Sequence, residues 1–307
     1  MKEIESWQNG KWLPNSKIGT SLWSAHFFFG YAVFDAFRSY NHNLHMLGEH
    51  IDRLYRSAQS AFIDIPIPKK DMISLVYDVI EHNKQFFPKD EEYRFMIFVS
   101  PGVFKVFEDM GNTESVVTIN LTTTSRYAKY IAPYLEKGYT SLITHQRQIP
   151  SRFLDPKIKS CSRLHYGLAG AEAAQLGDGV MPILLDEHGY IAESHGSNIG
   201  FVKDNKLCLP KTRDMLDGCT MQFVKKLAKN RCIDIIYDNW EPYDIINSDG
   251  IIYTSTFSGI MPSWKIIHKG VEHILNNDDD YVISVLTNEF SVQVGLDIEE
   301  QWRKWLK

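Results

Sequence analysis

Two lysines stand one residue apart in the stretch DPKIKSCSRLHYG, which covers residues 155–167. A lysine amine can form a Schiff base with a carbonyl compound, so Lys157 or Lys159 could act in covalent catalysis. The following stretch, LAGAEAAQLG, has a helical pattern. A basic turn on the surface explains the same residues, and the local pattern alone leaves both interpretations open.

An arginine on a predicted helix is the second candidate. In GEHIDRLYRSA, residues 48–58, helical spacing places His50, Arg53 and Ser57 near one face. The guanidinium of Arg53 could bind a phosphate with its planar fork of donors. A solvated amphipathic helix is the alternative explanation of this spacing.

Three further segments end in polar residues that could face a ligand. Gly218, Cys219 and Thr220 in MLDGCTMQF begin a predicted helix, whose first amides could bind an anion. Glu193 ends a strand in YIAESHGSNIGF and could hold a positive charge, and IYTSTFSGIMP ends a strand in a hydroxyl-rich turn. Capped helix starts and solvated loops are the ordinary alternatives.

Taken together, these segments supply what pyridoxal phosphate requires. A lysine amine forms the Schiff base. An acid keeps the pyridine nitrogen protonated, so that the ring accepts electrons. An arginine and backbone amides would hold the phosphate.

The composition excludes several other classes of protein. The 307 residues are 44% hydrophobic, which is enough for one large or two ordinary domains. The net charge of -5 does not favour nucleic acid, and the 11 histidines form no HxxxH or HExxH pattern, so we predict no metal site. We expect a cytoplasmic protein without a membrane partner, because its four cysteines form no CxxC pair and no apolar run resembles a signal peptide or membrane span.

Periodicity predicts an α/β protein with mixed sheets. Asn9 and Gly10 should form the turn of a hairpin over residues 4–12. Further strands are predicted at 31–40, 44–46, 92–99, 115–123, 140–144, 181–185, 190–193, 199–203, 206–209, 233–237 and 251–254. Helices are predicted at 47–62, 69–87, 164–176, 219–230 and 298–305, while 284–295 could be a strand or a helix. We expect a domain at 1–124, a linker at 125–137, and a second domain at 138–307 that contains the lysine.

The order of these segments resembles the class IV (fold type IV) pyridoxal-phosphate enzymes. That family includes branched-chain aminotransferases, D-amino acid aminotransferases and aminodeoxychorismate lyases. The resemblance extends from about Trp7 to Pro262 and rests on FGYAVFDAFRSYN, EHIDRLYRSA, IKSCSRLHYGLAGAEA, ESHGSN, LDGCT and TSTFSGIMP. The distance to Ala173 in the third motif matches Lys159 rather than Lys157 to the family's lysine.

The resemblance implies a two-domain fold like that of D-amino acid aminotransferase, a homodimer, and amino acid and keto acid substrates. It implies Lys159 as the catalytic residue. The implied contacts to pyridoxal 5′-phosphate are Arg53, Lys159, Glu193, Ser197, Asn198, Gly218, Cys219, Thr220, Ser255 and Thr256. The residues implied on the substrate side are Phe34, Arg94, Arg163, Phe257 and Ser258.

Several positions depart from the family pattern. Ser162 and Arg163 replace Asn-Tyr or Asn-Leu, so Arg163 could contact cofactor or substrate, or form a salt bridge. Gly259 replaces an acid, and Pro101 stands where D-amino acid enzymes carry a carboxylate-binding arginine. Arg94 falls where branched-chain enzymes have an arginine, although it could also be a residue at the surface edge of a strand. We therefore predict a branched-chain type aminotransferase, with a D-amino acid aminotransferase or aminodeoxychorismate lyase as the alternative.

Overall fold

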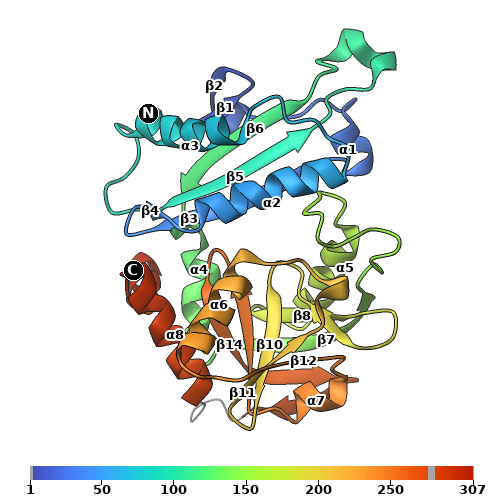
Figure 1. Cartoon of the computed structure of the whole chain (residues 1–307), viewed down its shortest axis with the longest axis vertical. Coiled ribbons are helices and arrows are strands. Elements are labelled where there is room, and N and C mark those ends of the chain that lie inside the picture. The colour runs from blue at the N-terminus through green and yellow to red at the C-terminus, as the bar shows by residue number, and fades with distance from the viewer. Residues whose placement is uncertain (1–2, 276–280, 307) are drawn as a thin grey trace. The chain divides into compact units, whose positions relative to one another are not determined.

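The computed structural model describes residues 3–275 and 281–306, and the contacts divide the chain into two units (Figure 1). Unit 1 comprises Met1–Arg126 and Ile158–Arg163, and unit 2 comprises Tyr127–Lys157 and Leu164–Lys307. This division differs from the predicted one, because the segment that carries Lys159 groups with unit 1. The predicted linker at 125–137 is largely helical: η3 (Ser125–Tyr127), α4 (Ala128–Ile131) and η4 (Ala132–Tyr134).

Unit 1 contains an antiparallel sheet. Among the described residues it has six strands in the order β2-β1-β6-β5-β3-β4. They are β1 (Glu5–Gln8), β2 (Lys11–Pro14), β3 (Val33–Tyr40), β4 (Asn43–Leu44), β5 (Tyr93–Ser100) and β6 (Val116–Thr123). Asn9 and Gly10 join β1 to β2 with φ angles of 44° and 83°, which confirms the predicted hairpin turn.

The core of unit 1 forms where α2 (Leu47–Ser60) and α3 (Lys69–Asn83) cover the sheet. Figure 1 shows α2 running across β3 and β5. Ile51 and Leu54 of α2 are buried against strand residues such as Phe37 and Phe95. The polar face of α2 that includes Arg53 is buried as well, so the solvated-helix interpretation is wrong.

Three short helices of unit 1 were not predicted: η1 (Asn15–Lys17), α1 (Ala25–Phe29) and η2 (Lys105–Met110). The sequence around α1 is rich in aromatic residues and lacks an amphipathic period, so only its ends mark it as a helix. Ser24 caps it by accepting a hydrogen bond from the Phe27 N–H, and Gly30 ends it in the left-handed conformation.

Unit 2 contains a mixed sheet. Its path is β12-β11-β10-β13-β14-β7-β8-β9, and β15 pairs with β14, which makes nine strands within the described ranges. The pairs β11–β12, β14–β7 and β7–β8 are parallel. The strands are β7 (Tyr139–Arg147), β8 (Val180–Leu185), β9 (Ile191–Glu193), β10 (Asn198–Lys203), β11 (Lys206–Pro210), β12 (Ile235–Asp238), β13 (Gly250–Ser255), β14 (Gly259–His268) and β15 (Val271–Ile274).

The helices of unit 2 are α5 (Leu164–Ala174), η5 (Thr212–Asp214), α6 (Cys219–Asn230), α7 (Pro242–Ile246), α8 (Tyr281–Val294) and α9 (Ile298–Leu306). The ambiguous segment at 284–295 is therefore helical. In the part of the chain that the structure describes, no helix is long and apolar enough to cross a membrane. The described residues also contain no group of His, Cys, Asp or Glu side chains that could hold a metal ion.

Candidate active site

The backbone of Lys159 is fixed by β3 and α2. The Phe34 N–H donates to the Lys159 carbonyl at 2.9 Å, and the Cys161 N–H donates to the Ala32 carbonyl at 2.8 Å. The Lys159 N–H donates to Ser57 Oγ on α2 at 3.1 Å. The lysine segment thus extends the edge of β3 locally, which explains its grouping with unit 1.

Gly30 allows this segment to approach the end of α1 closely. Its φ angle is +61°, and a Cβ atom there would lie 3.0 Å from the Cys161 carbonyl oxygen and the Ser162 nitrogen. Ser162 Oγ donates to the Phe29 carbonyl at 2.9 Å. Both the backbone conformation and the close contact therefore favour glycine at position 30.

The side chains of Lys159 and Arg163 meet the same aromatic ring. Lys159 Nζ lies 4.8 Å from the centroid of the Phe34 ring, and Arg163 Cζ lies 5.5 Å from it. Phe34 also stacks on Phe98, with centroids 5.6 Å apart. Two of the residues predicted on the substrate side, Phe34 and Arg163, thus lie beside the predicted catalytic lysine.

Arg53 forms a buried ion pair with Asp35 on β3. Arg53 Nε donates to Asp35 Oδ2 and Nη2 donates to Oδ1, both at 2.8 Å, and His50 Nδ1 lies 2.7 Å from Oδ1. Burial alone would raise the Asp35 pKa, but Arg53 and His50 outweigh burial and hold the pKa below its usual value. Burial lowers the pKa of His50, against the opposing effect of Asp35. The phosphate contact of Arg53 stays a prediction.

Glu193 is only 3% exposed at the end of β9, so the solvated alternative is wrong for this residue. Its Oε1 accepts hydrogen bonds from Gln148 Nε2 at 2.7 Å and from the Tyr166 hydroxyl at 2.5 Å. Its Oε2 accepts from Asn198 Nδ2 at 3.2 Å, and the Leu216 N–H lies 3.2 Å from both oxygens. These neutral donors fix the carboxylate in place.

The start of α6 lies beside the Glu193 cluster. Gly218 is the N-cap residue. A larger residue does not fit there, because a Cβ atom would lie 1.9 Å from Asn198 Oδ1. Cys219 and Thr220 follow in the first turn, and both are buried. Binding of an anion by the amides at this helix start stays a prediction.

The turn after β13 holds the last predicted contacts. Ser255 Oγ and Ser258 Oγ are 2.8 Å apart, and the Ser258 N–H donates to Ser255 Oγ at 3.3 Å. Phe257 stacks on Tyr127 with centroids 5.4 Å apart and ring planes 5° apart. Gly259 has a φ angle of +70°, which disfavours an acid at this position.

Arg94 lies in β5, a central strand between β6 and β3, so the surface-edge interpretation is wrong. Its Nη1 donates to Thr122 Oγ1 at 3.4 Å, and its Nη2 approaches Met96 Sδ at 3.1 Å. The role of Arg94 in binding substrate stays a prediction.

The comparisons with known proteins decide the family. The family model described as Amino-transferase class IV matches residues 32–266. The chain belongs to the class IV aminotransferases. Enzymes of this family use pyridoxal 5′-phosphate, so the aminotransferase is a pyridoxal-phosphate-dependent transaminase.

Relatives of known name agree with this assignment. The aminotransferase is 30% identical over 260 residues to a "putative branched-chain-amino-acid aminotransferase" of Methanocaldococcus jannaschii, covering 84% of this chain and 86% of the relative. It is 24% identical over 261 residues to the "D-alanine aminotransferase" of Bacillus licheniformis, covering 84% and 87%. The solved branched-chain aminotransferase of Thermoproteus uzoniensis with norvaline has the same fold, with a TM-score of 0.82, 20% identity, and coverage of 99% of this chain and 98% of that one.

The described residues fit the cofactor of the aminotransferase. Buried hydroxyl oxygens of Ser194, Ser197 and Thr254 have no hydrogen-bond partner among the residues that the structure describes. Leaving such a group unsatisfied costs about 1–3 kcal/mol, so a polar ligand at these atoms would be stabilising. The sequence prediction included Ser197 but missed Ser194 and Thr254, which adjoin predicted residues.

Three residues around the predicted site were also missed: Gln148 and Tyr166 beside Glu193, and Asp35 beside Arg53. Gln148 and Tyr166 are 45 and 27 residues from Glu193 in the sequence. For Asp35 the sequence held a signal, since an acid between apolar neighbours in a strand requires a partner when it is buried.

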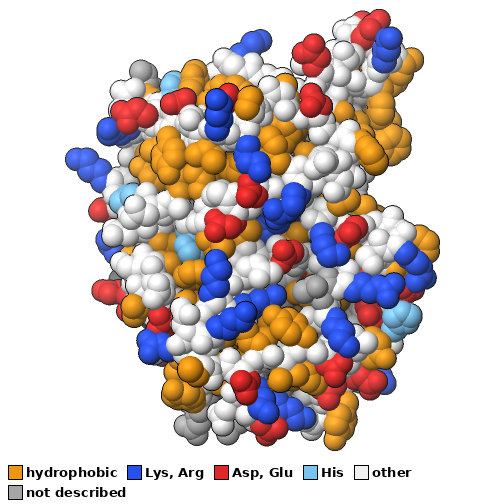
Figure 2. Space-filling view, viewed as in Figure 1, with side chains coloured by type: hydrophobic (Ala, Val, Ile, Leu, Met, Phe, Trp, Pro, Cys, Tyr) orange, Lys and Arg blue, Asp and Glu red, His pale blue; other side chains and the backbone are white. Residues whose placement is uncertain are grey.

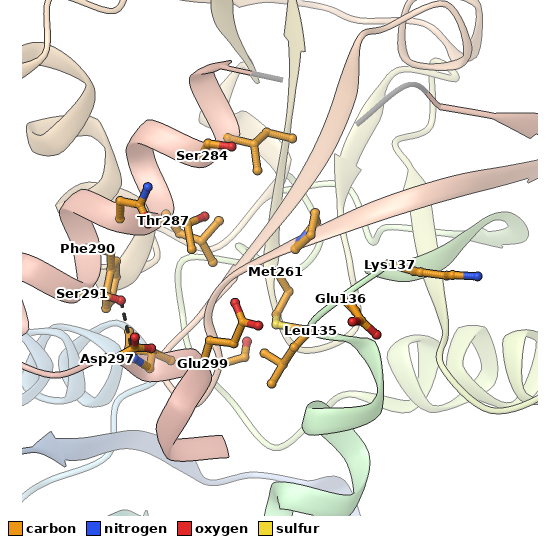
Figure 3. Close-up of a pocket in the computed structure, with 16 residues that line it drawn as sticks. Leu135, Glu136, Lys137, Met261, Ser284, Thr287, Phe290, Ser291, Asp297 and Glu299 are labelled. Atoms are coloured by element: carbon orange, nitrogen blue, oxygen red, sulfur yellow. Dashed lines mark hydrogen bonds between the residues drawn. The ribbon is translucent and has the colours of Figure 1, made fainter. Parts of the chain in front are cut away.

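Unit 2 also contains a cavity of about 390 Å³ between α8, the start of α9 and β14 (Figure 3). Met261 and Phe290 contribute apolar surface to it, and Glu299 lies at its α9 side. Ser258, which the sequence places on the substrate side, is among the lining residues.

Proposed function

We propose that this aminotransferase moves an amino group between a branched-chain type L-amino acid and a 2-keto acid such as 2-oxoglutarate. The observation that carries the proposal is the apolar wall of Phe34 and Phe98 beside Lys159. An aliphatic side chain packed on this wall would be removed from water, which favours leucine-like substrates. The name of the Methanocaldococcus jannaschii relative supports the same substrate class.

A D-amino acid aminotransferase is the second candidate, because the Bacillus licheniformis relative carries that activity in its name. Pro101 argues against it. Pro101 directly follows β5, where the resemblance to D-amino acid enzymes would require an arginine. Proline has no side-chain donor for a substrate carboxylate.

We further propose which residues hold pyridoxal 5′-phosphate. Glu193 would accept a hydrogen bond from the pyridine N–H, and Lys159 would carry the covalent link. The phosphate would be bound by an arginine, backbone amides and hydroxyls: Arg53, Gly218, Cys219, Thr220, Ser255 and Thr256. Ser197 and Asn198 would complete the surroundings of the ring.

The chain's own residues then perform the proton transfers. When bound, the cofactor supplies an aldehyde that combines with amines and a ring that accepts electron density. Lys159 Nζ would be the group that takes the proton from the substrate Cα and gives one back, as general base and then general acid. Glu193 would hold the proton of the ring nitrogen. Release of the keto acid would consume water, and the amino group would stay with the cofactor until a second keto acid accepts it, which predicts ping-pong kinetics.

A panel of L- and D-amino acids, assayed with and without 2-oxoglutarate, tests this function. We expect conversion of leucine, isoleucine and valine in their L forms, and turnover only when the keto acid is present. Faster conversion of D-alanine would favour the second candidate. Turnover of aminodeoxychorismate to pyruvate without an acceptor would instead identify a lyase.

We also propose a cytoplasmic homodimer. The four cysteines all lie within the described residues and form no disulfide there, as expected in a reducing compartment. Hydrophobic side chains lie exposed near α1 (Figure 2). Phe27, Phe28 and Phe29 of α1 are 52–67% exposed. A patch of this kind commonly marks a protein interface. Light scattering at micromolar concentration should give twice the mass of the 35.5 kDa chain.

A further inference from the structure

We infer that Arg163 is a specificity-determining residue that binds the distal carboxylate of a dicarboxylate substrate, with the Phe34 ring as its platform. The inference rests on the proposed function and deepens it. An enzyme that exchanges amino groups between leucine and 2-oxoglutarate must accept an apolar side chain and a charged one in the same site. Arg163 supplies the charge that the second substrate requires.

The shared ring places Arg163 within reach of the reacting carbon. Lys159 Nζ and Arg163 Cζ lie 4.8 Å and 5.5 Å from the centroid of the Phe34 ring. The two charged groups are therefore within roughly 10 Å of each other. In a five-carbon dicarboxylate, the distal carboxylate lies roughly 4–5 Å from the reacting carbon. A substrate whose Cα faces Lys159 can thus bring this carboxylate to the guanidinium.

Arg94, the other arginine predicted on the substrate side, lies farther from the lysine. In the pairing of β3 with β5, Phe34 is opposite Phe98 and Arg38 is opposite Arg94. Phe98 and Arg94 are four residues apart on one strand, which corresponds to about 13 Å along the sheet. Of these two arginines, Arg163 is therefore the one beside the lysine and its aromatic wall.

The main chain around Arg163 is anchored, which leaves the side chain able to change its position. Its backbone follows Ser162, whose Oγ donates to the Phe29 carbonyl at 2.9 Å, and precedes α5, which begins at Leu164. The main chain is held on both sides, so only the long side chain has to move.

The chemistry of arginine fits both substrates. With a leucine-like substrate, the guanidinium stays on the face of Phe34, where stacking stabilises a cation beside apolar groups. With glutamate or 2-oxoglutarate, the same group forms a forked pair with the distal carboxylate. A lysine at this position would provide a point charge without the planar fork, so it would replace Arg163 only in part.

The decisive experiment measures ligand binding by the cofactor-loaded enzyme with two unreactive probes. Glutarate carries two carboxylates, and 4-methylpentanoate carries one carboxylate and an aliphatic chain. For Arg163→Gln, we expect the glutarate Kd and the KM for 2-oxoglutarate to rise by about 10- to 100-fold. The Kd for 4-methylpentanoate should change much less, within about twofold, since this probe lacks the second carboxylate.

Two further variants complete the test. Arg163→Lys should recover part of the affinity for glutarate, because it restores the charge. Lys157→Gln removes an exposed cation of the neighbouring segment and should leave both probes unaffected.

An equal loss of affinity for both probes in Arg163→Gln would overturn the inference, because it would mean a contact with the common α-carboxylate or a structural role. Unchanged binding of both probes would overturn it as well. Neither result affects the proposed function, which fails only if the unmodified enzyme does not transfer the amino group of a branched-chain amino acid.

Discussion

Two buried carboxylates, one in each unit, are held in opposite ways. Asp35 in unit 1 meets the Arg53 guanidinium through two hydrogen bonds and His50 through a third. Glu193 in unit 2 meets amide, phenol and backbone N–H donors, among them Gln148 and Tyr166. Arginine cancels the charge of a carboxylate, whereas neutral donors fix its position and leave its charge in place.

This difference separates a structural acid from one suited to a ligand. Asp35 pairs with Arg53 inside the protein and orients this arginine, which we propose binds the phosphate. We propose that the charge of Glu193 stabilises a protonated ring nitrogen. Removal of the Asp35 carboxylate should therefore mainly affect stability, and removal of the Glu193 carboxylate should mainly affect catalysis and cofactor affinity. Removal of the Lys159 amine should affect catalysis alone.

The largest effect is expected for Lys159→Ala. Loss of the amine removes both the covalent link and the proton carrier, so kcat should fall by about 10³-fold or more. The visible absorbance of the lysine-bound cofactor should disappear, while thermal unfolding of the apoprotein should change little. In Lys157→Ala, absorbance and turnover should both persist. Full turnover in Lys159→Ala would contradict the assignment and transfer it to Lys157.

Asp35→Asn should mainly affect stability. The substitution leaves Arg53 buried without its compensating charge, which costs about 3–5 kcal/mol of unfolding free energy by chemical denaturation. Because the folded-state pKa of Asp35 lies below its usual value, this contribution is complete above about pH 5 and declines as the pH falls below about 4. The difference between wild type and variant should therefore shrink in acid.

The exposed ion pair between Asp52 of α2 and Lys69 of α3 offers a control for Asp35. Asp52→Asn should cost less than about 1 kcal/mol, since water screens the pair. A similarly small cost for Asp35→Asn would show that the buried pair does not hold α2 on the sheet.

Glu193→Gln should affect catalysis most and cost some stability as well. The amide oxygen can keep the hydrogen bonds on one side, but its NH2 group would face donors on the other side, and the variant lacks the charge that favours a protonated ring nitrogen. We expect kcat and cofactor affinity to fall by about 10- to 100-fold. Absorbance titration of the apoprotein with pyridoxal phosphate measures the affinity. Glu187→Gln, at an exposed acid paired with Arg152, should behave as wild type.

The sequence predicted much of the fold wherever a local pattern governs the structure. The Asn9-Gly10 turn requires positive φ angles, and the spacing of apolar residues in α2 requires one buried face. Local patterns failed for β14, where Pro262 and alternating polar residues conceal a strand that lies inside the sheet. They were also ambiguous for α8, whose valines and isoleucine suit either structure.

The site was predictable only as a set of motifs. Motif order identified Lys159 and Glu193 as candidates, but not the groups that position them. Tyr166 and Gln148 reach Glu193 from α5 and the end of β7, and such contacts depend on how the elements pack. No spacing rule connects residues that are 27 or 45 positions apart.

The chain leaves unit 2 after Lys157, adds the lysine segment to the edge of β3, and returns to unit 2 at Leu164. The lysine therefore belongs to one unit by contact and to the other by its place in the sequence. A gene fragment ending near Arg126 would encode unit 1 without this segment. A unit encoded alone would lack either the lysine segment or the strand that this segment pairs with. We therefore expect the two units to evolve as one gene.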